Sequence, residues 1–272
     1  MKSALSKKMI FAALGLPALG LGADITNHLA SPQVLSIVPD REQFEAVRPA
    51  EEVGSRAFYF TRAIYTGYRR GFYGSWSIDY PKADRQFLIG LRRLTNIDAY
   101  ELENPIRLDD PDIRRFPFLY ALEVGYMSLS EAEVVGLREY LQAGGFLVID
   151  DFWGSYEWSN FESEIGRVLP GYAIVKLPLD HPVLRTFYDI TELVQVPNVR
   201  QGMMGGPTWE RDGYEPALLG IFDEKGRLMV VINWNTDLGD AWEWAENPFY
   251  PLKFSNFAYQ MGVNLVIYAM SH

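Results

Sequence analysis

The sequence contains no cysteine and only three histidines in its 272 residues. Without cysteine there is no disulfide, thiol nucleophile, lipid-modified cysteine or thiolate metal ligand, so stability has to come from the hydrophobic core. His28 lies in the N-terminal part and His272 at the last position, which leaves His181 as the one internal histidine. A single internal imidazole excludes the usual multi-histidine zinc sites.

Positive charge is also scarce. Lysine and arginine total 25 against 35 acidic residues, which gives a formal charge of −10. The arginine pairs at 69–70, 92–93 and 114–115 are scattered rather than massed. Because an acidic surface repels phosphate backbones, we expect no nucleic-acid partner.

The N-terminal part contains the longest uncharged apolar run. Lys2, Lys7 and Lys8 precede this run at 9–21, and small residues follow it. The run is too short to span a bilayer comfortably and is typical of a secretory signal peptide; the alternative is an uncleaved anchor. We predict a signal peptide at 1–23, a leader segment at 24–54 and a single domain at 55–272. The protein would be periplasmic or secreted, with no transmembrane segment after cleavage.

The most informative stretch lies at 144–154. Gly144 and Gly145 precede its apolar residues 146–149, and Asp150 and Asp151 follow them. This pattern predicts a strand buried on both faces of a parallel sheet. Ligands of such sheets bind beyond the carboxyl ends of the strands, where the two aspartates would lie.

Strand-like and helix-like segments alternate along the rest of the chain. Capping boxes at Ser130–Glu133 and Ser159–Glu162 mark two of the helix starts, and Gly144 marks a helix end. The predicted strands are 57–65, 97–102, 118–124, 146–151, 173–176, 217–223 and 227–233, and the predicted helices are 82–95, 130–143, 159–169 and 254–270. This order predicts an α/β fold: a mostly parallel sheet with helices on both faces and a C-terminal β-hairpin addition.

Several short motifs in the same order resemble a bacterial family catalogued as domain of unknown function 4159. They are Phe60-Thr61-Arg62 with Tyr65, Trp76 with Asp79-Tyr80-Pro81, 116–120, 144–146 with Asp150-Asp151, Asp180-His181-Pro182, and 235–243. The resemblance covers roughly 57–269 and implies a flavodoxin-like sheet similar to that of class I glutamine amidotransferases. In that wider group a catalytic cysteine follows the strand that matches 146–151. Here Asp150-Asp151-Phe152 hold the place, so amidotransferase chemistry does not carry over.

Asp150 and Asp151 would point to opposite faces if both continued the strand. One could serve as a nucleophile, general base or metal ligand, while the other braces the loop; equally, both could be structural. His181 could pair with Asp151 for acid–base chemistry. An Asp-His-Pro turn with the imidazole bonded to backbone is the interpretation that we favour for His181.

Oxygen-bearing side chains are concentrated at 235–243. Asn235, Asp237, Asp240 and Glu243 could coordinate Ca²⁺ or Mg²⁺, although the glycine and glutamate spacing of an EF-hand is missing. The favoured interpretation is a helix N-terminus that Asp237 or Asp240 caps. We therefore predict no cofactor. If these residues do hold an ion, it would be a divalent cation.

Further ligand-binding candidates lie on the first strand and on predicted loops. Arg62 and Tyr65 would face the same crevice, where Arg62 could hold a carboxylate or phosphate, or pair with Asp150 or Glu243. The tryptophans could stack on sugar rings or cover the core. Those on predicted loops are Trp76, Trp153, Trp209 and Trp242.

Two functions are compatible with these residues. The first is a non-catalytic ligand-binding or envelope-assembly domain, whose partner is a small molecule, an envelope component or an envelope protein. The alternative is a hydrolase acting on a cell-envelope or sugar-like substrate, in which Asp151 and either Glu243 or His181 carry out acid–base chemistry. The hydrolase requires these groups to converge on one point.

Overall fold

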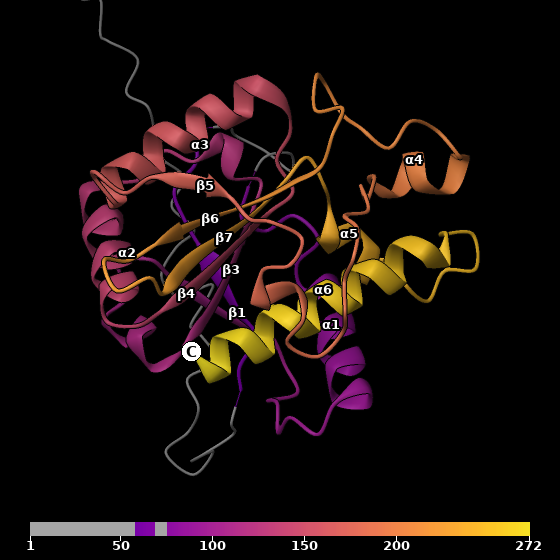
Figure 1. Cartoon of the computed structure of the whole chain (residues 1–272), viewed down its shortest axis with the longest axis horizontal. Coiled ribbons are helices and arrows are strands. Elements are labelled where there is room, and N and C mark those ends of the chain that lie inside the picture. Colours follow the sequence, from indigo (N-terminus) through magenta and orange to yellow (C-terminus); the bar gives the residue numbers. More distant parts are fainter. Residues whose placement is uncertain (1–57, 69–74) are drawn as a thin grey trace, which may run out of the picture. The chain divides into compact units, whose positions relative to one another are not determined.

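The computed structural model describes residues 58–68 and 75–272. The predicted signal peptide and leader segment lie outside the described residues. The described part is an α/β structure with a seven-stranded mixed sheet in the order β2-β1-β3-β4-β7-β6-β5 (Figure 1). The strands are β1 (Thr61–Ile64), β2 (Asn104–Arg107), β3 (Phe118–Leu122), β4 (Phe146–Asp150), β5 (Ile174–Lys176), β6 (Ala217–Phe222) and β7 (Leu228–Trp234).

Helices cover both faces of this sheet (Figure 1). The helices are α1 (Lys82–Leu94), α2 (Glu131–Gln142), α3 (Gly154–Val168), α4 (Val199–Met204), α5 (Leu238–Glu243) and α6 (Leu252–Ser271). Side chains of α1, α5 and α6 share one core with Phe146 and Val148 of β4, whereas α2 and α3 share the other with Leu147 and Ile149. The alternation along β4 therefore supplies both cores. No helix in the described ranges has the length and apolar character needed to cross a membrane.

The strand predicted from residues 144–154 is confirmed as β4, the fourth of seven. It pairs in parallel with β3 on one side and with β7 on the other. β1 pairs in parallel with both β2 and β3, so five neighbouring strands end at the same edge of the sheet. We call this edge the carboxyl edge. Asp150 is the last residue of β4 and lies there, as predicted.

β6 and β7 pair with each other antiparallel, and β5 pairs antiparallel with β6. Residues 217–223 and 227–233 thus form the expected antiparallel pair. β7 is nevertheless an interior strand, because it also pairs with β4, so the pair is part of the main sheet.

The two largest differences from the sequence-based expectation concern β2 and α3. The segment 97–102 contributes only an isolated bridge between Ala99 and Phe58, and the strand is β2 at Asn104–Arg107. β2 contains Pro105, which its edge position tolerates because an edge strand does not need every N–H. The other difference is α3, which begins at Gly154 and not at Ser159.

The early start of α3 depends on two carboxylates, one from a remote loop and one from its own first turn. The Asp212 carboxylate, from a loop 57 residues away in sequence, accepts hydrogen bonds from Ser155 N (2.9 Å) and Ser155 Oγ (2.6 Å). Glu157 Oε2 accepts a further one from Trp153 N (2.6 Å). These acceptors satisfy N–H groups that a helix start leaves unpaired. The second predicted capping box is therefore wrong, and Ser159 lies inside the helix.

Candidate functional site

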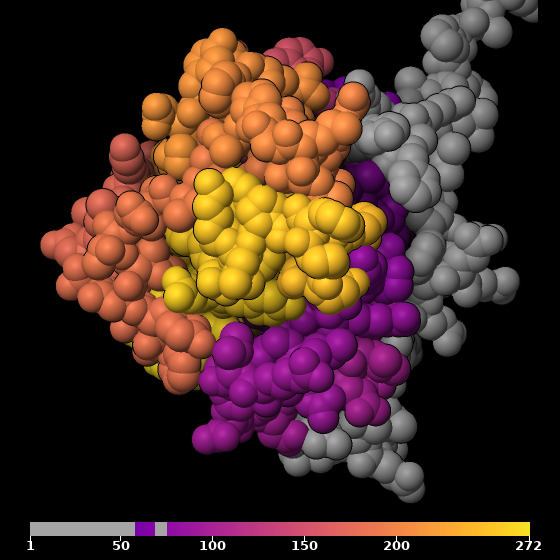
Figure 2. All heavy atoms as spheres, turned by 90° about the vertical axis from the view of Figure 1, so that its right-hand side faces the viewer, coloured from indigo at the N-terminus to yellow at the C-terminus, as the bar shows by residue number. Residues whose placement is uncertain are grey.

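Five carboxylates converge at the carboxyl edge. One oxygen each of Asp79, Asp151 and Asp237 lie within 4.8 Å of one another, and the same holds for Asp79, Asp240 and Glu243. We call these five residues the acidic cluster. Asp151 follows β4, Asp79 precedes α1, and the others belong to the start and body of α5. Figure 2 shows the face on which α1 (purple) and the segment that leads from α5 into α6 (yellow) lie side by side.

α5 presents its acids through its own capping interactions. Asp237 is the N-cap, as predicted, and its Oδ1 accepts a hydrogen bond from Asp240 N at 2.7 Å. Asp240 Oδ2 accepts one from Val199 N, the first residue of α4, at 2.5 Å. Capping and membership of the acidic cluster are thus compatible, because each bond occupies one carboxylate oxygen.

Three residues that directly follow neighbouring strands have left-handed backbone. Glu123 after β3, Asp151 after β4 and Asn235 after β7 have φ of 53°, 46° and 60°. Backbone hydrogen bonds join this row, from Glu123 N to Asp151 O (3.0 Å) and from Asp151 N to Thr236 O (3.1 Å). Left-handed backbone is costly for residues other than glycine, and surrounding contacts have to hold it. The row turns the chain sharply at the carboxyl edge, and Asp151 therefore does not continue the strand.

Asp150 braces α5 against the sheet. Its Oδ2 accepts hydrogen bonds from Tyr120 Oη (2.6 Å), Leu238 N (2.9 Å) and Gly239 N (3.1 Å). Its Oδ1 is buried and has no hydrogen-bond partner among the described residues. Burial raises the pKa of Asp150 to about 7, against the opposing effect of these hydrogen bonds. Of the two roles weighed for Asp150, its contacts are those of the structural one.

The raised pKa of Asp150 gives a pH-dependent stability. Between its unfolded pKa near 3.8 and its folded pKa of about 7, the folded state keeps a proton that the unfolded chain releases. The free energy of unfolding should therefore fall as pH rises, by up to about 1.4 kcal/mol per pH unit. Asp150→Asn keeps the accepting oxygen and removes the contribution of Asp150 to this slope, so its stability should depend less steeply on pH. Urea unfolding at pH 5, 6, 7 and 8 without divalent cations measures it; parallel curves for the two proteins would contradict the prediction.

Asp79 joins the two halves of the acidic cluster. Its Oδ2 is buried and, within 58–68 and 75–272, has no hydrogen-bond partner. Burial and the charges of Asp240 and Glu243 raise the pKa of Asp79 well above its ordinary value. The pKa values of Asp151 and Asp237 are raised as well, first by burial and then by neighbouring carboxylates. The cluster therefore disfavours full ionisation of its carboxyl groups, although the charges of Arg62 on Asp79 and of Lys82 on Glu243 act in the opposite direction.

Gly239 makes the approach of Asp79 feasible. A Cβ atom on Gly239 would lie 2.7 Å from Asp79 Oδ2 and 3.2 Å from Tyr120 Oη, closer than ordinary van der Waals contact. The carboxylate thus occupies space that any other residue at this position would fill.

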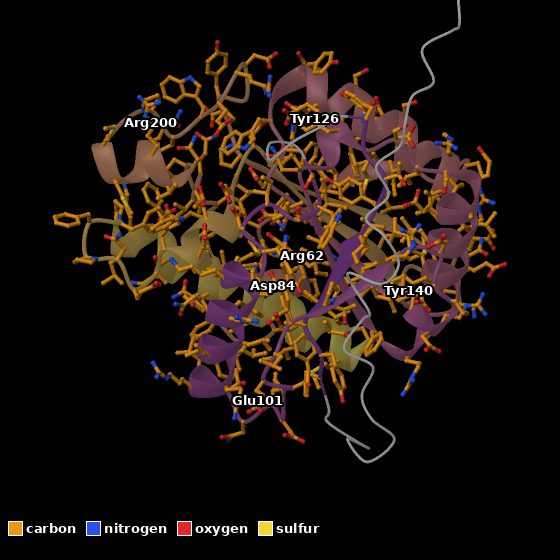
Figure 3. All side chains as sticks on the ribbon, turned by 180° about the vertical axis from the view of Figure 1, so that it is seen from behind. Arg62, Asp84, Glu101, Tyr126, Tyr140 and Arg200 are labelled. Carbon is orange, nitrogen blue, oxygen red and sulfur yellow. The ribbon has the colours of Figure 1, made fainter. Side chains whose placement is uncertain are left out.

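Arg62 lies near the cluster but binds elsewhere. Its side chain is fully buried and pairs with Asp84 of α1, with Nε 3.2 Å from Oδ2 (Figure 3). Its Nη1 donates to Ile78 O at 3.2 Å. The guanidinium also stacks over the Tyr120 ring at 4.9 Å. The expected pairing of Arg62 with Asp150 or Glu243 is therefore wrong. The guanidinium instead binds the carboxylate of Asp84, a residue that the sequence pattern does not single out.

The remaining ligand-binding candidates are mostly internal. Tyr65 is buried, and its Oη donates to Leu122 O at 2.7 Å. Trp76 and Trp153 are also buried, and Trp153 Nε1 donates to Asp151 Oδ1 at 2.9 Å. Trp242 belongs to α5 rather than to a loop and is 1% exposed. Its ring packs on Phe87 in the core, so it offers no face to a sugar.

Trp209 and Asn235 complete these candidates. Trp209 is 40% exposed and packs edge-on against Tyr214. Asn235 Oδ1 accepts a hydrogen bond from Gly154 N at 2.8 Å, and its Nδ2 donates to Glu215 O at 2.8 Å. Asn235 therefore ties the turn after β7 to the start of α3 and does not belong to the acidic cluster.

His181 lies at the opposite edge of the sheet. Its Nδ1 accepts a hydrogen bond from Val183 N at 3.2 Å, which confirms the predicted turn. Its ring packs on Phe222, the residue that pairs with Leu228 at the beginning of β7. The carboxyl edge is at the other end of β7, so pairing of His181 with Asp151 is wrong. Asp151 and Glu243, by contrast, both lie beside Asp79.

Sequence reasoning did not select Asp79 or Tyr120 as site residues. Both lie within the motifs that carry the family resemblance, Asp79 directly before Tyr80-Pro81. The motif Asp79-Tyr80-Pro81 was the available signal, because it places an acid directly before two residues that carry the resemblance. In the structure Asp79 has a left-handed backbone with φ of 59°, which Asp tolerates better than most residues.

Comparison with known proteins places the chain in one family. No curated protein matches the sequence. Residues 60–270, which include the whole acidic cluster, match the family described as "Domain of unknown function (DUF4159)". The match extends over well more than half of the sequence, and the chain therefore belongs to the DUF4159 family.

Proposed function

We propose that the protein binds a divalent cation at the acidic cluster and, through it, a small molecule or envelope component, without catalysing a reaction. The observation that carries the proposal is Asp79 Oδ2, a buried oxygen without a hydrogen-bond partner in the described residues, among four other carboxylates. A buried carboxylate without a partner is costly, and a bound cation would supply the missing charge.

The spacing and chemistry of the ligands fit a hard cation. Mg²⁺ and Ca²⁺ prefer oxygen ligands at about 2.0–2.6 Å, so oxygens on opposite sides of one ion are about 4–5 Å apart. The oxygens of each triplet lie within 4.8 Å of one another. Each triplet consists of carboxylates alone, a set that disfavours softer metals.

Cation binding should raise the thermal stability of the folded protein. At a hundredfold excess over Kd, Mg²⁺, Ca²⁺ or Mn²⁺ is expected to add about 2.7 kcal/mol, or roughly 5–10 °C in Tm. Asp79→Asn should abolish the rise, whereas Asp180→Asn, which removes an exposed charge elsewhere, should keep it. Thermal melts with each ion and with a chelator measure this. An unchanged rise in Asp79→Asn would refute the site.

For the scaffold we propose a flavodoxin-like arrangement related to that of class I glutamine amidotransferases. In chain order the parallel strands β2-β1-β3-β4-β7 are numbered 2-1-3-4-5, the order of flavodoxin-like sheets. Asp151 also supports it, because this residue occupies a left-handed turn between β4 and α3, the kind of turn that exposes a nucleophile in other α/β enzymes.

A carboxylate-dependent, metal-assisted hydrolase is the second candidate. The observation in its favour is that Asp151 and Asp237 converge with Asp79 on one point. It predicts cation-dependent turnover of a panel of chromogenic sugar and ester substrates, with Asp151→Asn as the inactive control. Turnover no faster than that of Asp151→Asn would exclude it for those substrates.

We propose further that the protein is exported to the periplasm or secreted, with residues 1–23 removed. The support is the lysine-flanked uncharged run at 9–21. N-terminal sequencing of the protein from a periplasmic fraction would test this, and an intact N-terminus in the cytoplasm would contradict it.

A further inference from the structure

We propose that the acidic cluster holds two divalent cations side by side, with Asp79 as the bridging ligand between them. This inference rests on the proposed cation binding and specifies how many ions are bound and how the residues are divided. Asp151 and Asp237 would hold the first ion, and Asp240 and Glu243 the second.

The division follows from the way that the carboxylates are grouped. Two triplets meet the distance condition of 4.8 Å, and Asp79 is the member that they share. The first triplet combines Asp79 with the turn after β4 and the N-cap of α5, and the second combines it with two residues one turn apart on α5. Pairs of divalent cations in proteins lie about 3.5–4 Å apart, a separation that one carboxylate can bridge.

The bridging role requires Asp79 to lie between the two groups. Asp79 Oδ2 is 2.7 Å from the position of a Cβ on Gly239, and Asp237 Oδ1 is 3.5 Å from the same point. Gly239 lies between Asp237 and Asp240 in sequence, so Asp79 points at the first turn of α5. It does so with an oxygen that is buried and has no hydrogen-bond partner in the described structure.

Oxygens remain for the ions on the other ligands. Asp151 uses Oδ1 for Trp153 Nε1, Asp237 uses Oδ1 for Asp240 N, and Asp240 uses Oδ2 for Val199 N. The Trp244 side chain also interacts with the Asp240 carboxylate. The bonds from Trp153, Asp240 N and Val199 each engage one oxygen of a carboxylate, so a cation can bind the other oxygen while the orienting contact is kept.

The charge balance also favours two ions over one. The five carboxylates carry five negative charges when ionised. A single divalent cation would leave three uncompensated, in a region where Asp151, Asp237 and Asp240 are each buried, whereas two would leave one. The nearby cations form their ion pairs with other acids, since Arg62 pairs with Asp84 and Lys82 Nζ lies 3.2 Å from Glu246 Oε1, although the charge of Lys82 also lowers the pKa of Glu243.

Mn²⁺ binding to the full chain tests the inference. The number of bound Mn²⁺ ions can be counted, and their paramagnetism shows whether two of them lie next to each other. Equilibrium dialysis should give two Mn²⁺ per chain, and electron paramagnetic resonance should show them as an exchange-coupled pair. Asp151→Asn and Asp240→Asn should each keep one uncoupled ion, and Asp79→Asn should weaken both sites at least about 10-fold. Asp180→Asn is the matched control and should retain the coupled pair.

The outcomes separate this inference from the proposed function. One Mn²⁺ per chain that depends on Asp79 would overturn the pair and leave the proposed function standing, whereas no Mn²⁺ binding would overturn both. If Asp79→Asn does not fold, as circular dichroism would show, the other two variants decide. A coupled pair that persists in Asp151→Asn or Asp240→Asn overturns the proposal.

Discussion

Arg62→Met is expected to lower the free energy of unfolding by about 3–5 kcal/mol. Arg62 and Asp84 are both completely buried, and Asp84 would be left as a buried carboxylate without its partner. The carbonyl of Ile78 would lose its guanidinium donor at the same time. Because Ile78 directly precedes Asp79, the variant should also weaken cation binding. Urea unfolding at pH 7, with and without Mg²⁺, measures both effects.

An exposed pair supplies the control for Arg62→Met. Arg114 and Glu139 also form an ion pair, but their side chains are 52% and 53% exposed, so Arg114→Met should cost at most about 1 kcal/mol. The double variant Arg62→Met/Asp84→Leu should recover much of the loss, since neither charge then remains buried. A loss below about 1 kcal/mol for Arg62→Met would show that the pair is not what anchors β1 to α1.

Gly239→Ala is expected to remove the cation-dependent rise in Tm. The new Cβ would lie 2.7 Å from Asp79 Oδ2, so the carboxylate has to shift away from the first turn of α5 and from its place between the two triplets. Alanine favours a helix over glycine by about 1 kcal/mol, but steric overlap in a packed site typically costs about 1–3 kcal/mol. We therefore expect a net loss of stability together with the loss of binding. Thermal melts with and without Mn²⁺ separate the loss of stability from the loss of cation binding.

Gly166 provides a matched control within α3. A Cβ at Gly166 would meet no atom within 4 Å, so Gly166→Ala should stabilise the fold by about 0.5–1 kcal/mol and leave the cation response intact. Should Gly239→Ala keep the full response to Mn²⁺, Asp79 would not be a ligand.

The fold and the place of the site could be predicted because both depend on local patterns. The apolar run that closes with Asp150 and Asp151 specifies a buried strand, and strands of that kind end at a ligand-binding edge. Spacing within 235–243 likewise indicated the N-cap Asp237. In both instances, the residues that determine the local structure are consecutive in the sequence.

The composition of the site could not be predicted because its contacts join distant segments. More than 150 residues separate Asp79 from α5 in the sequence. No periodicity in the sequence predicts a contact between segments so far apart. Arg62 was assigned to the wrong acids because its true partner, Asp84, lies on a helix whose inward face reads as apolar. The start of α3 was misplaced for the same reason, since Asp212 supplies its acceptor from a remote loop.

That remote acceptor has a consequence for how the chain matures. Synthesis proceeds from the N-terminus, so Ser155 is made long before Asp212. Until the loop arrives, the opening turn of α3 lacks that cap, and the helix can begin stably only further along its length. The opening turn of α3, directly after β4, therefore obtains this cap only after Asp212 has been translated, when β1 to β5 have already been made.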